Sequence, residues 1–555
     1  MKNWRVNLVF LIFIIFSATI TSRLFYLQIM KKDLYRALAQ GQQQSFYSSA
    51  GERGKIFFGN GQILATNIKS KIVTASPEKM DKKEETIKAL AEVLKLEQAS
   101  ISEVINGERT SNIIKKDATE EEERALNDLK IPGVAVQEVV LRRYPYGSTA
   151  SQIVGFLGGE GAGQYGLEGY YDDALKGKEC FRKAGGGVGL FGGQTSCDGS
   201  DIFLTIDYNI QSTAEKILKE AKENLHIEGG TIIVMDPNSG KVLALANLPD
   251  FDPNNYSQVE DFSVFQNSAV QKFYEPGSVF KSITMAAALD AQKVAPSTTY
   301  TDEGEIKIGN YTIFNYARKT WGEQTMTAVL EQSINTGAIF AERQIGHELF
   351  TEYIKKFGFL EPTDIDLQGE VSSENKRFQE GYEVNFANAA FGQGIEVTPI
   401  QMARAFSAIA NGGKLVKPYV VEKVSNGGKV IQAEPPVSES RIISQKAASQ
   451  LTAMLISVVE NGSGRQAKIP GYYIAGKTGT SQVPWSAFGV NKRGYSEKTW
   501  QSFVGFAPAF NARFMILVKL DNPSTKTAEQ SATPLFKEMA KYILDYLEIP
   551  PDYNQ

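Results

Sequence analysis

The stretch YEPGSVFKSITMAAALDAQ, residues 274–292, is the part of the sequence on which the fold prediction depends most. Pro276 and Gly277 end an extended segment, and the alanine-rich run after them predicts a buried helix. Ser278 then lies in the first helical turn, with Lys281 one turn later on the same face. A helix N-terminus offers backbone N–H groups and the positive end of its dipole, where an oxyanion would form.

The spacing of Ser278 and Lys281 indicates a nucleophile and its base. A serine hydroxyl is a weak nucleophile alone, but a desolvated lysine beside another cation has a pKa low enough to act as its base. The same SxxK spacing also begins at Ser76 and at Ser373, so the pattern by itself is a weak signal. Only the match at Ser278 is followed by a predicted buried helix, which makes Ser278 the candidate nucleophile.

Two further short motifs lie downstream. SIN, residues 333–335, is by itself typical of a helix cap or a turn. KTGT, residues 477–480, contains the single KTG of the chain. The motifs SxxK, SxN and KTG follow one another at separations of 55 and 144 residues. Each is weak alone, but in this order they form a strong constellation.

The KTGT motif predicts an edge strand that faces a ligand. By the alternation of a strand, Thr478 and Thr480 share one face, and Gly479 has no side chain to block a ligand lying along the backbone. Lys477 would supply the positive charge that draws in a carboxylate and lowers the pKa of Lys281.

The sequence after residue 200 predicts one large mixed α/β domain. Residues 206–225 have helical periodicity, and residues 229–249 form two apolar β-branched runs around DPNSG, which reads as a hairpin. Residues 514–520 predict a buried strand and residues 533–547 a closing helix. Strands at both ends with helices between them favour a domain over residues 201–550.

The first part of the chain contains shorter elements. Between residues 33 and 130, β-rich pieces alternate with amphipathic helical pieces at residues 81–96 and 118–130. The glycine-rich segment 177–200 predicts an irregular connection or a long hairpin, and it is the best domain boundary in the chain.

Residues 6–22 form an uncharged, largely apolar segment at the lower edge of membrane-spanning length. A cleaved signal peptide is the alternative, but no clear cleavage site follows. We therefore expect an uncleaved anchor, preceded by a tail of residues 1–5. Charges on both sides orient this anchor poorly, so its orientation has to come from the chemistry.

The composition excludes several classes of protein. The 555 residues carry a formal net charge of −4 without a basic half, so nucleic-acid binding is not expected. The chain has two histidines, His226 and His347, which excludes a His-rich metal site and disfavours a Ser-His-Asp hydrolase. Its two cysteines, Cys180 and Cys197, exclude a Cys-rich zinc module but allow one disulfide bridge.

The three motifs resemble those of the penicillin-recognising serine transpeptidase superfamily. Neighbouring sequences resemble the class B penicillin-binding proteins in particular, and YEPGSVFK and SFVGFAPA are most similar to the division-specific, septal branch. The stretches that carry this resemblance are RRYPYGSTASQIVGF (142–156), GQYGLEGYYDDALKG (163–177), FDPN (251–254), FGQGIEVTPIQMARAFSAIANGG (391–413) and FVGFAP (503–508).

This resemblance implies an α+β, mixed α/β protein with three parts: a single transmembrane helix, an elongated pedestal or dimerisation domain over residues 23–200, and the penicillin-binding domain. The last, residues 201–550, is expected to have a β-lactamase-like fold, an antiparallel sheet with helices on both sides, followed by a tail of residues 551–555. One departure lies in RGKIFFGNGQILA, where Phe58 and Gly59 stand in place of the Asp and Arg usual in the family.

The resemblance also implies a reaction, acyl transfer on a peptidoglycan stem peptide that ends in D-Ala-D-Ala. Ser278 would attack the penultimate carbonyl and Lys281 would take its proton. Ser333 would pass a proton to the departing amine, while Asn335 would hold the substrate amide and the lysine.

The remaining site residues are assigned in the same way. The backbone N–H groups of Ser278 and Thr480 would form the oxyanion hole, a contribution of about 3 kcal/mol per donor. The carboxylate would bind to Lys477, Thr478 and Thr480, beside Gly479. An acceptor amine from a neighbouring stem peptide would then resolve the acyl-enzyme. No metal or organic cofactor is expected.

The polymer lies outside the cytoplasmic membrane, so the resemblance orients the chain as a single-pass protein with its N-terminus inside. Expected partners are β-lactams as covalent inhibitors, a membrane-embedded glycan polymerase and other division proteins. On the oxidising side of the membrane Cys180 and Cys197 would close a loop of about 18 residues, worth ~3 kcal/mol, with two free thiols as the alternative.

Three other functions stay open at this point. They are an elongation-type transpeptidase of the same class, a hydrolase of the superfamily (a D,D-carboxypeptidase, β-lactamase or β-lactam sensor), and a catalytically silent division scaffold.

Overall fold

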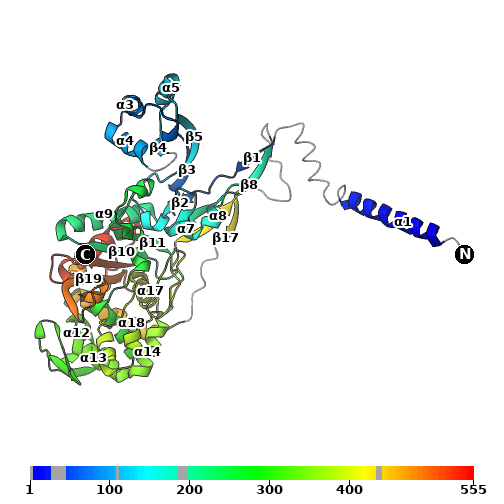
Figure 1. Ribbon diagram of the computed structural model, residues 1–555. Helices are drawn as coiled ribbons and strands as arrows, with labels where there is room; N and C mark the ends of the chain where they lie inside the picture. Colours follow the sequence, from blue (N-terminus) through cyan, green and yellow to red (C-terminus); the bar gives the residue numbers. More distant parts are fainter. Residues whose placement is uncertain (1–3, 27–45, 108–111, 184–196, 433–440, 555) are drawn as a thin grey trace. The chain divides into compact units, whose positions relative to one another are not determined.

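The structure is a computed structural model of residues 1–555 (Figure 1), and its described residues are 4–26, 46–107, 112–183, 197–432 and 441–554. The chain is of the mixed α/β type, as predicted. It divides into two compact units. The smaller comprises residues 1–54, 173–201 and 425–429, and the larger comprises residues 55–172, 202–424 and 430–555.

The smaller unit contains the N-terminal helix α1 (Trp4–Phe25) and a two-stranded antiparallel sheet of β1 (Phe46–Ala50) and β8 (Glu179–Lys183). The segment predicted as an irregular connection therefore begins with a strand, because residues 179–183 find a partner about 130 residues earlier in the chain. Residues 184–196 of that segment lie outside the described part.

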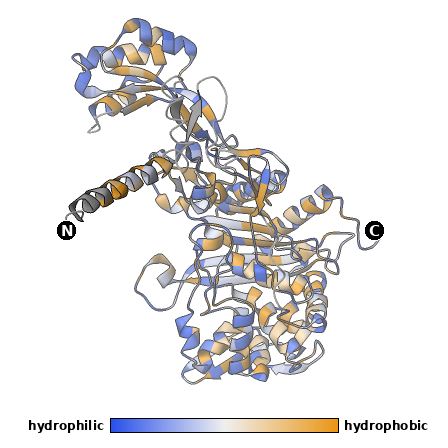
Figure 2. Cartoon of the chain, turned by 90° about the vertical axis from the view of Figure 1, so that its right-hand side faces the viewer, coloured by the Kyte–Doolittle hydropathy of each residue, from blue (hydrophilic) through white to orange (hydrophobic). Residues whose placement is uncertain are grey.

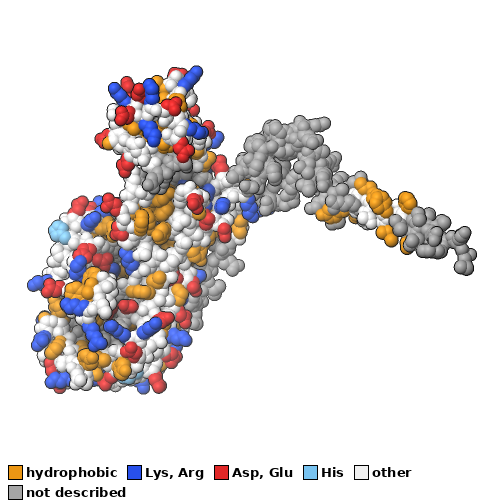
Figure 3. All heavy atoms as spheres, viewed as in Figure 1, with side chains coloured by type: hydrophobic (Ala, Val, Ile, Leu, Met, Phe, Trp, Pro, Cys, Tyr) orange, Lys and Arg blue, Asp and Glu red, His pale blue; other side chains and the backbone are white. Residues whose placement is uncertain are grey.

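Helix α1 is largely hydrophobic where Figure 2 colours it, and several of its large apolar side chains are exposed (Figure 3). They include Leu11, Phe13, Ile15 and Phe16, which are 52%, 64%, 58% and 62% exposed. Within the part of the chain that the structure describes, no helix meets the combined length and apolarity required of a membrane span.

The larger unit begins with a sheet in which the long strand β3 (Ile63–Ala75) pairs antiparallel with β5 (Val134–Arg143) and with β4 (Asn112–Lys115). Three helices follow the apolar patterns of the sequence, α3 (Lys83–Leu94), α4 (Gln98–Asn106) and α5 (Glu120–Leu129). The helices predicted at residues 81–96 and 118–130 are thus confirmed as α3 and α5, and both are shorter than predicted at each end. Both end early because Lys95 and Lys130 adopt left-handed conformations, at φ 54° and 46°.

Of the two residues that depart from the family pattern, Phe58 is buried in a packed interior, and Gly59 is exposed but lies close to a neighbouring backbone segment. The Phe58 ring is 1% exposed and meets Tyr146 and Tyr208 edge-on, at centroid distances of 5.9 and 5.4 Å. Gly59 N donates to Ile206 O at 2.7 Å, and a Cβ at Gly59 would lie 3.0 Å from Leu204 O. An aromatic cluster and a close backbone approach therefore occupy the place of a charged pair.

The predicted second domain is built on a five-stranded antiparallel sheet in the order β11-β10-β20-β19-β18. The predicted hairpin is β10 (Gly229–Met235) with β11 (Val242–Leu248), and the predicted buried strand is β20 (Phe514–Asp521). Strands β19 (Tyr495–Ala507) and β18 (Ala475–Pro484) complete the sheet, with β18 at its edge.

Helices cover both faces of this sheet (Figure 1). One core joins α9 (Tyr208–Leu225) and the closing helix α19 (Ala532–Tyr546) to alternate strand residues such as Ile232 and Ile516. The intervening residues face α17 (Pro399–Ala410), next to which packs α18 (Gln445–Asn461). Alternation along the strands therefore buries both faces.

The helical part beside α17 and α18 carries two of the motifs. Helix α11 (Lys281–Asp290) is buried along its length, as predicted, and packs against α18 and α13 (Asn335–Ile345). Helix α12 (Met326–Glu331) precedes α13. Two small antiparallel strand pairs connect α11 to α12. They are β12 (Thr299–Asp302) with β15 (Gly322–Thr325), and between these in the sequence β13 (Glu305–Ile308) with β14 (Tyr311–Phe314).

Candidate active site

Ser278 lies in a short 3₁₀ turn, η5 (Gly277–Phe280), directly before α11. The sequence predicted that it would occupy the first turn of the helix itself, and the tighter turn follows from Gly277. That residue has φ +56°, and its N–H donates to Gly392 O at 3.0 Å. Ser278 is half-buried, at the point where the turn meets the edge strand β18.

Lys281 is 1% exposed and its ammonium group is surrounded by acceptors from the SIN motif. Its Nζ atom donates to Ser333 O at 2.5 Å, to Asn335 Oδ1 at 2.8 Å and to Ser333 Oγ at 3.3 Å. Burial, with the nearby charge of Lys477 as a smaller cause, holds the pKa of Lys281 well below its ordinary value. A lysine in this environment can accept a proton.

Ser333 lies between two lysines, since Lys477 Nζ also donates to its hydroxyl, at 3.0 Å. Ser333 has φ +57°, a left-handed conformation that is rare for a serine. The structure thus brings the SxxK, SxN and KTG motifs together, although they are far apart in the sequence. Strained residues held by their surroundings cluster at functional sites.

Lys477 is fully buried on β18, and its Nζ atom also donates to Thr478 O at 3.1 Å and to Thr478 Oγ1 at 3.2 Å. Burial lowers its pKa to about 7. On the same strand, Thr480 Oγ1 accepts from Ala528 N at 3.1 Å. The prediction that KTGT lies on an edge strand is confirmed by the strand order.

The lack of a side chain at Gly479 has a consequence that was not predicted. A Cβ at Gly479 would lie 2.7 Å from Val279 Cγ2 and 2.8 Å from Pro276 O. Real Cβ atoms essentially never approach so closely, and both atoms belong to the segment that carries Ser278. The absence of a side chain at Gly479 therefore allows β18 to lie in contact with η5, the turn that carries Ser278 and is called the serine turn below.

A buried polar network, which no sequence pattern indicated, supports the SIN motif. Asn315 Oδ1 accepts from the backbone N–H groups of Asn335 and Thr336 at 3.0 and 3.1 Å. Asp302, 1% exposed, accepts from Asn315 Nδ2 at 2.9 Å and from Thr336 Oγ1 at 2.5 Å. Burial opposes ionisation, but hydrogen bonds from Thr336 and Asn315 hold the pKa of Asp302 below its ordinary value.

The other two SxxK matches have different surroundings. Ser76 precedes the short turn η2 (Pro77–Lys79) without a capping hydrogen bond from its side chain, and Ser373 Oγ donates to Glu396 Oε2 at 3.2 Å. Among the described side chains, neither hydroxyl bonds to a lysine. Within the same described part, no group of three or more His, Cys, Asp or Glu side chains is placed to hold a metal ion.

Cys197 is disulfide-bonded, and no free cysteine occurs among the described residues. The side chain of Cys180 lies outside the described part of the structure. Its pairing with Cys197 therefore stays a prediction.

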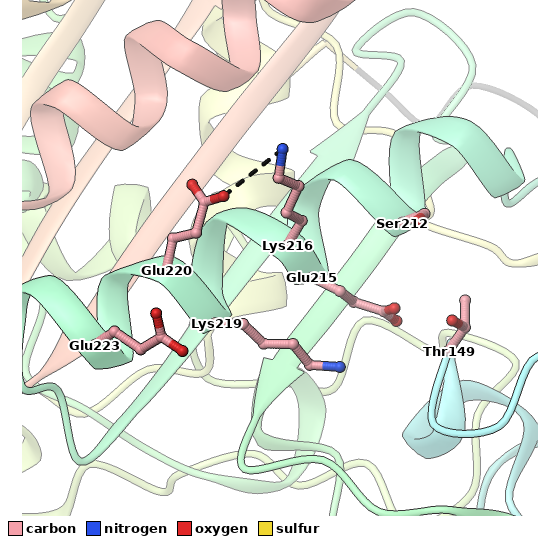
Figure 4. A pocket seen from close by; sticks show the side chains of 7 residues that line it. All are labelled: Thr149, Ser212, Glu215, Lys216, Lys219, Glu220 and Glu223. Carbon is pink, nitrogen blue, oxygen red and sulfur yellow. Dashed lines mark ion pairs between the residues drawn. The ribbon is translucent and has the colours of Figure 1, made fainter.

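A separate surface pocket of about 240 Å³ lies along α9 (Figure 4). Its walls carry both signs of charge, and Lys216 and Glu220 form an ion pair across one turn at 3.6 Å. None of the three motifs contributes to it. Its lining residues are Thr149, Ser212, Glu215, Lys216, Lys219, Glu220 and Glu223.

Comparison with protein families gives two matches that together cover most of the chain. Residues 230–541 match the penicillin binding protein transpeptidase domain. Residues 48–185 match the penicillin-binding protein dimerisation domain. The first match contains all three motifs.

Individual relatives align along almost the whole chain. Stage V sporulation protein D of Bacillus subtilis is 33% identical, over 99% of this chain and 87% of its own length. Peptidoglycan D,D-transpeptidase FtsI of Escherichia coli is 27% identical, over 99% and 93%. Among solved structures, penicillin binding protein 3 of Mycobacterium tuberculosis, complexed with aztreonam, superposes with a TM-score of 0.71 at 26% identity, covering 91% of this chain and 98% of that one.

Proposed function

This chain belongs to the class B penicillin-binding proteins, and we propose that it crosslinks peptidoglycan through an acyl-enzyme formed on Ser278. It is a serine D,D-transpeptidase and a target of β-lactam antibiotics. The observation that carries the proposal is the convergence of two buried lysines, Lys281 and Lys477, on the hydroxyl of Ser333.

In the first half of the reaction Ser278 Oγ attacks the carbonyl carbon of the penultimate D-Ala. Neutral Lys281 takes the hydroxyl proton, a role that its lowered pKa supports. The backbone N–H groups of Ser278 and Thr480 stabilise the oxyanion, because the serine turn and β18 lie in contact.

Collapse of the tetrahedral intermediate breaks the peptide bond and releases D-Ala. Ser333 passes a proton to the leaving amine, and the proton is replaced from Lys281, 3.3 Å away. Asn335 accepts from Lys281 Nζ at 2.8 Å and so holds the base beside the SIN turn. The acceptor amine then attacks the ester carbonyl and gives up a proton to Lys281. As the ester C–O bond breaks, Lys281 returns this proton to Ser278 Oγ and is neutral again.

The terminal carboxylate of the donor peptide binds at the edge strand. Lys477 supplies the positive charge, and Thr478 and Thr480 supply hydroxyl groups, with Gly479 between them. A carboxylate at this point pairs with the buried ammonium group and favours its charged form.

We also propose that residues 6–22 anchor the protein in the cytoplasmic membrane with the N-terminus inside. The support is helix α1 with its exposed apolar side chains (Figure 3), together with a polymer substrate that lies outside this membrane. In that location a membrane-embedded glycan polymerase and other division proteins are the expected partners.

Two cellular roles follow from the relatives. Similarity to FtsI of Escherichia coli favours septal crosslinking at division. Similarity to stage V sporulation protein D over 99% of the chain favours, as a second candidate, crosslinking during spore formation. Depletion of the native division enzyme, and separately deletion of the sporulation enzyme, with this chain supplied in trans, distinguishes the two.

The biochemical test is product analysis with a stem-peptide donor and an excess of acceptor amine. A transpeptidase transfers the acyl group to the amine, and the crosslinked product increases with amine concentration. Release of the acyl group to water alone at every amine concentration would instead identify a carboxypeptidase or a β-lactam-hydrolysing enzyme. Absence of any acyl-enzyme would identify a silent scaffold.

A further inference from the structure

Ser463 lies next to the predicted carboxylate site but belongs to none of the three motifs. It follows α18, and its Oγ atom is 3.0 Å from Thr478 Oγ1, with either hydroxyl able to donate. Its backbone N–H donates to the carbonyl oxygen of Glu331 at 2.9 Å. Glu331 ends α12, two residues before Ser333. Ser463 therefore connects the KTG strand to the helix that leads into the SIN turn.

Its neighbour Gly462 makes this position possible. A Cβ at Gly462 would lie 2.6 Å from Glu331 O and 2.7 Å from Glu331 Cα. The segment is thus pressed against the end of α12, which fixes where the hydroxyl of Ser463 can point.

The other hydrogen bonds of Thr478 indicate which of the two hydroxyl groups donates in this contact. A hydroxyl group has one hydrogen to donate and two lone pairs to accept with. Thr478 Oγ1 already accepts from Lys477 Nζ at 3.2 Å. If Ser463 donates as well, both lone pairs are used, and the hydrogen of Thr478 is left to point to a ligand.

We propose that Ser463 is a positioning residue that donates to Thr478 Oγ1 and thereby orients the Thr478 hydroxyl toward the carboxylate of the substrate. In the opposite arrangement Thr478 would donate its only hydroxyl hydrogen to Ser463, and none would be left to donate to a carboxylate. The inference rests on the proposed function and adds to it a residue that controls recognition of the carboxylate group without touching the reacting atoms.

The test measures acylation of the full-length protein by benzylpenicillin and by the benzylpenicillin methyl ester, which lacks the negative charge. Ser463→Ala should lower the second-order rate constant for benzylpenicillin by about tenfold, as expected for one hydrogen bond to a charged group. It should leave the rate constant for the ester unchanged. Ser463→Thr, which keeps a hydroxyl, should restore the native rate.

A double-mutant cycle checks that the effect passes through Thr478. Thr478→Val should slow acylation by benzylpenicillin, and adding Ser463→Ala to it should slow the reaction no further. Ser457→Ala is the matched control, because Ser457, on α18, donates through Oγ to the side chain of Glu331 on α12 and forms no hydrogen bond with the KTG strand among the described residues. This control should acylate like the native protein with both compounds.

Three results would overturn the inference: equal losses with benzylpenicillin and its ester, additive losses in the double variant, or a Ser463→Ala variant as fast as or faster than the native protein with benzylpenicillin. Failure of the proposed function looks different, because the native protein would then form no acyl-enzyme with either compound.

Discussion

Lys477 Nζ lies 3.0 Å from Ser333 Oγ. The same hydroxyl is 3.3 Å from Lys281 Nζ, so two buried ammonium groups share one serine. Two like charges this close in a dry interior disfavour each other, and together with burial this favours the neutral form of Lys281. The two lysines can therefore have different roles: a neutral Lys281 can act as the base, and a bound carboxylate favours the charged form of Lys477.

The burial of Lys477 predicts a pH-dependent stability. Its pKa is about 7 in the folded protein, against an ordinary value of 10.5. Between these values the unfolded chain binds one more proton at this position, so the free energy of unfolding rises with pH, by up to about 1.4 kcal/mol per pH unit. Lys477→Met lacks this contribution. Urea denaturation at pH 7, 8 and 9 should show the native protein gaining stability relative to this variant.

Exposed Lys446, on α18, provides the control for that experiment. Lys446→Met should stay parallel to the native protein over the same pH range. If the stability of Lys477→Met also changes with pH in parallel with the native protein, burial does not lower the pKa of Lys477.

Gly479→Ala should damage the active site through packing. Its new methyl group would meet Val279 and Pro276 at less than 3.0 Å, and it would push the serine turn away from β18. We expect penicillin acylation to slow by at least about tenfold, because small misplacements of reacting groups are costly. Gly159→Ala is the control, since the nearest atom to its Cβ is 3.9 Å away. Native-like acylation of Gly479→Ala would contradict the close contact.

Phe58→Ala should destabilise the fold without altering the chemistry. Removal of a fully buried phenylalanine typically costs about 3–5 kcal/mol. Phe58→Asp, which restores the family's usual residue, should cost more, since the position is 1% exposed and its ring partners are Tyr146 and Tyr208. Thermal melting measures both, with Phe262→Ala, at a side chain 68% exposed, as the control. A Phe58→Asp variant as stable as the native protein would show that the interior is packed differently.

Cys197 and Cys180 are expected to form the single disulfide of the chain. In the unreduced, denatured protein neither thiol should react with a maleimide, and both should react after reduction. Closing the loop stabilises the fold by ~3 kcal/mol in the chain-entropy model, so Cys197→Ala should lower the melting temperature. Quantitative labelling of both thiols before reduction would rule the bridge out.

The sequence predicted those parts of the site that depend on local patterns. The buried helix after Ser278 and the edge strand at Lys477 follow from apolar periodicity and short motifs, and both are present. The hairpin around residues 229–249 and the closing helix after residue 532 were predicted for the same reason.

Features that depend on contacts between distant segments could not be predicted. The hydrogen bonds of Asp302 to Asn315 and Thr336 join residues up to 34 positions apart, in no recognisable spacing. The contact of Ser463 with Thr478 and the clash that forbids a side chain at Gly479 likewise appear only when the strand is placed beside its neighbours. The 3₁₀ form of the Ser278 turn depends in the same way on Gly277 and its bond to Gly392.

The central claim is that Ser278 carries the acyl group, and peptide mass spectrometry after treatment with a β-lactam tests it most directly. We expect one adduct, on the peptide that contains Ser278, and none in Ser278→Ala, whose melting temperature should stay close to the native value. Ser76→Ala and Ser373→Ala, at the other SxxK matches, should label like the native protein. An adduct on a peptide without Ser278, or undiminished labelling of Ser278→Ala, would contradict the account.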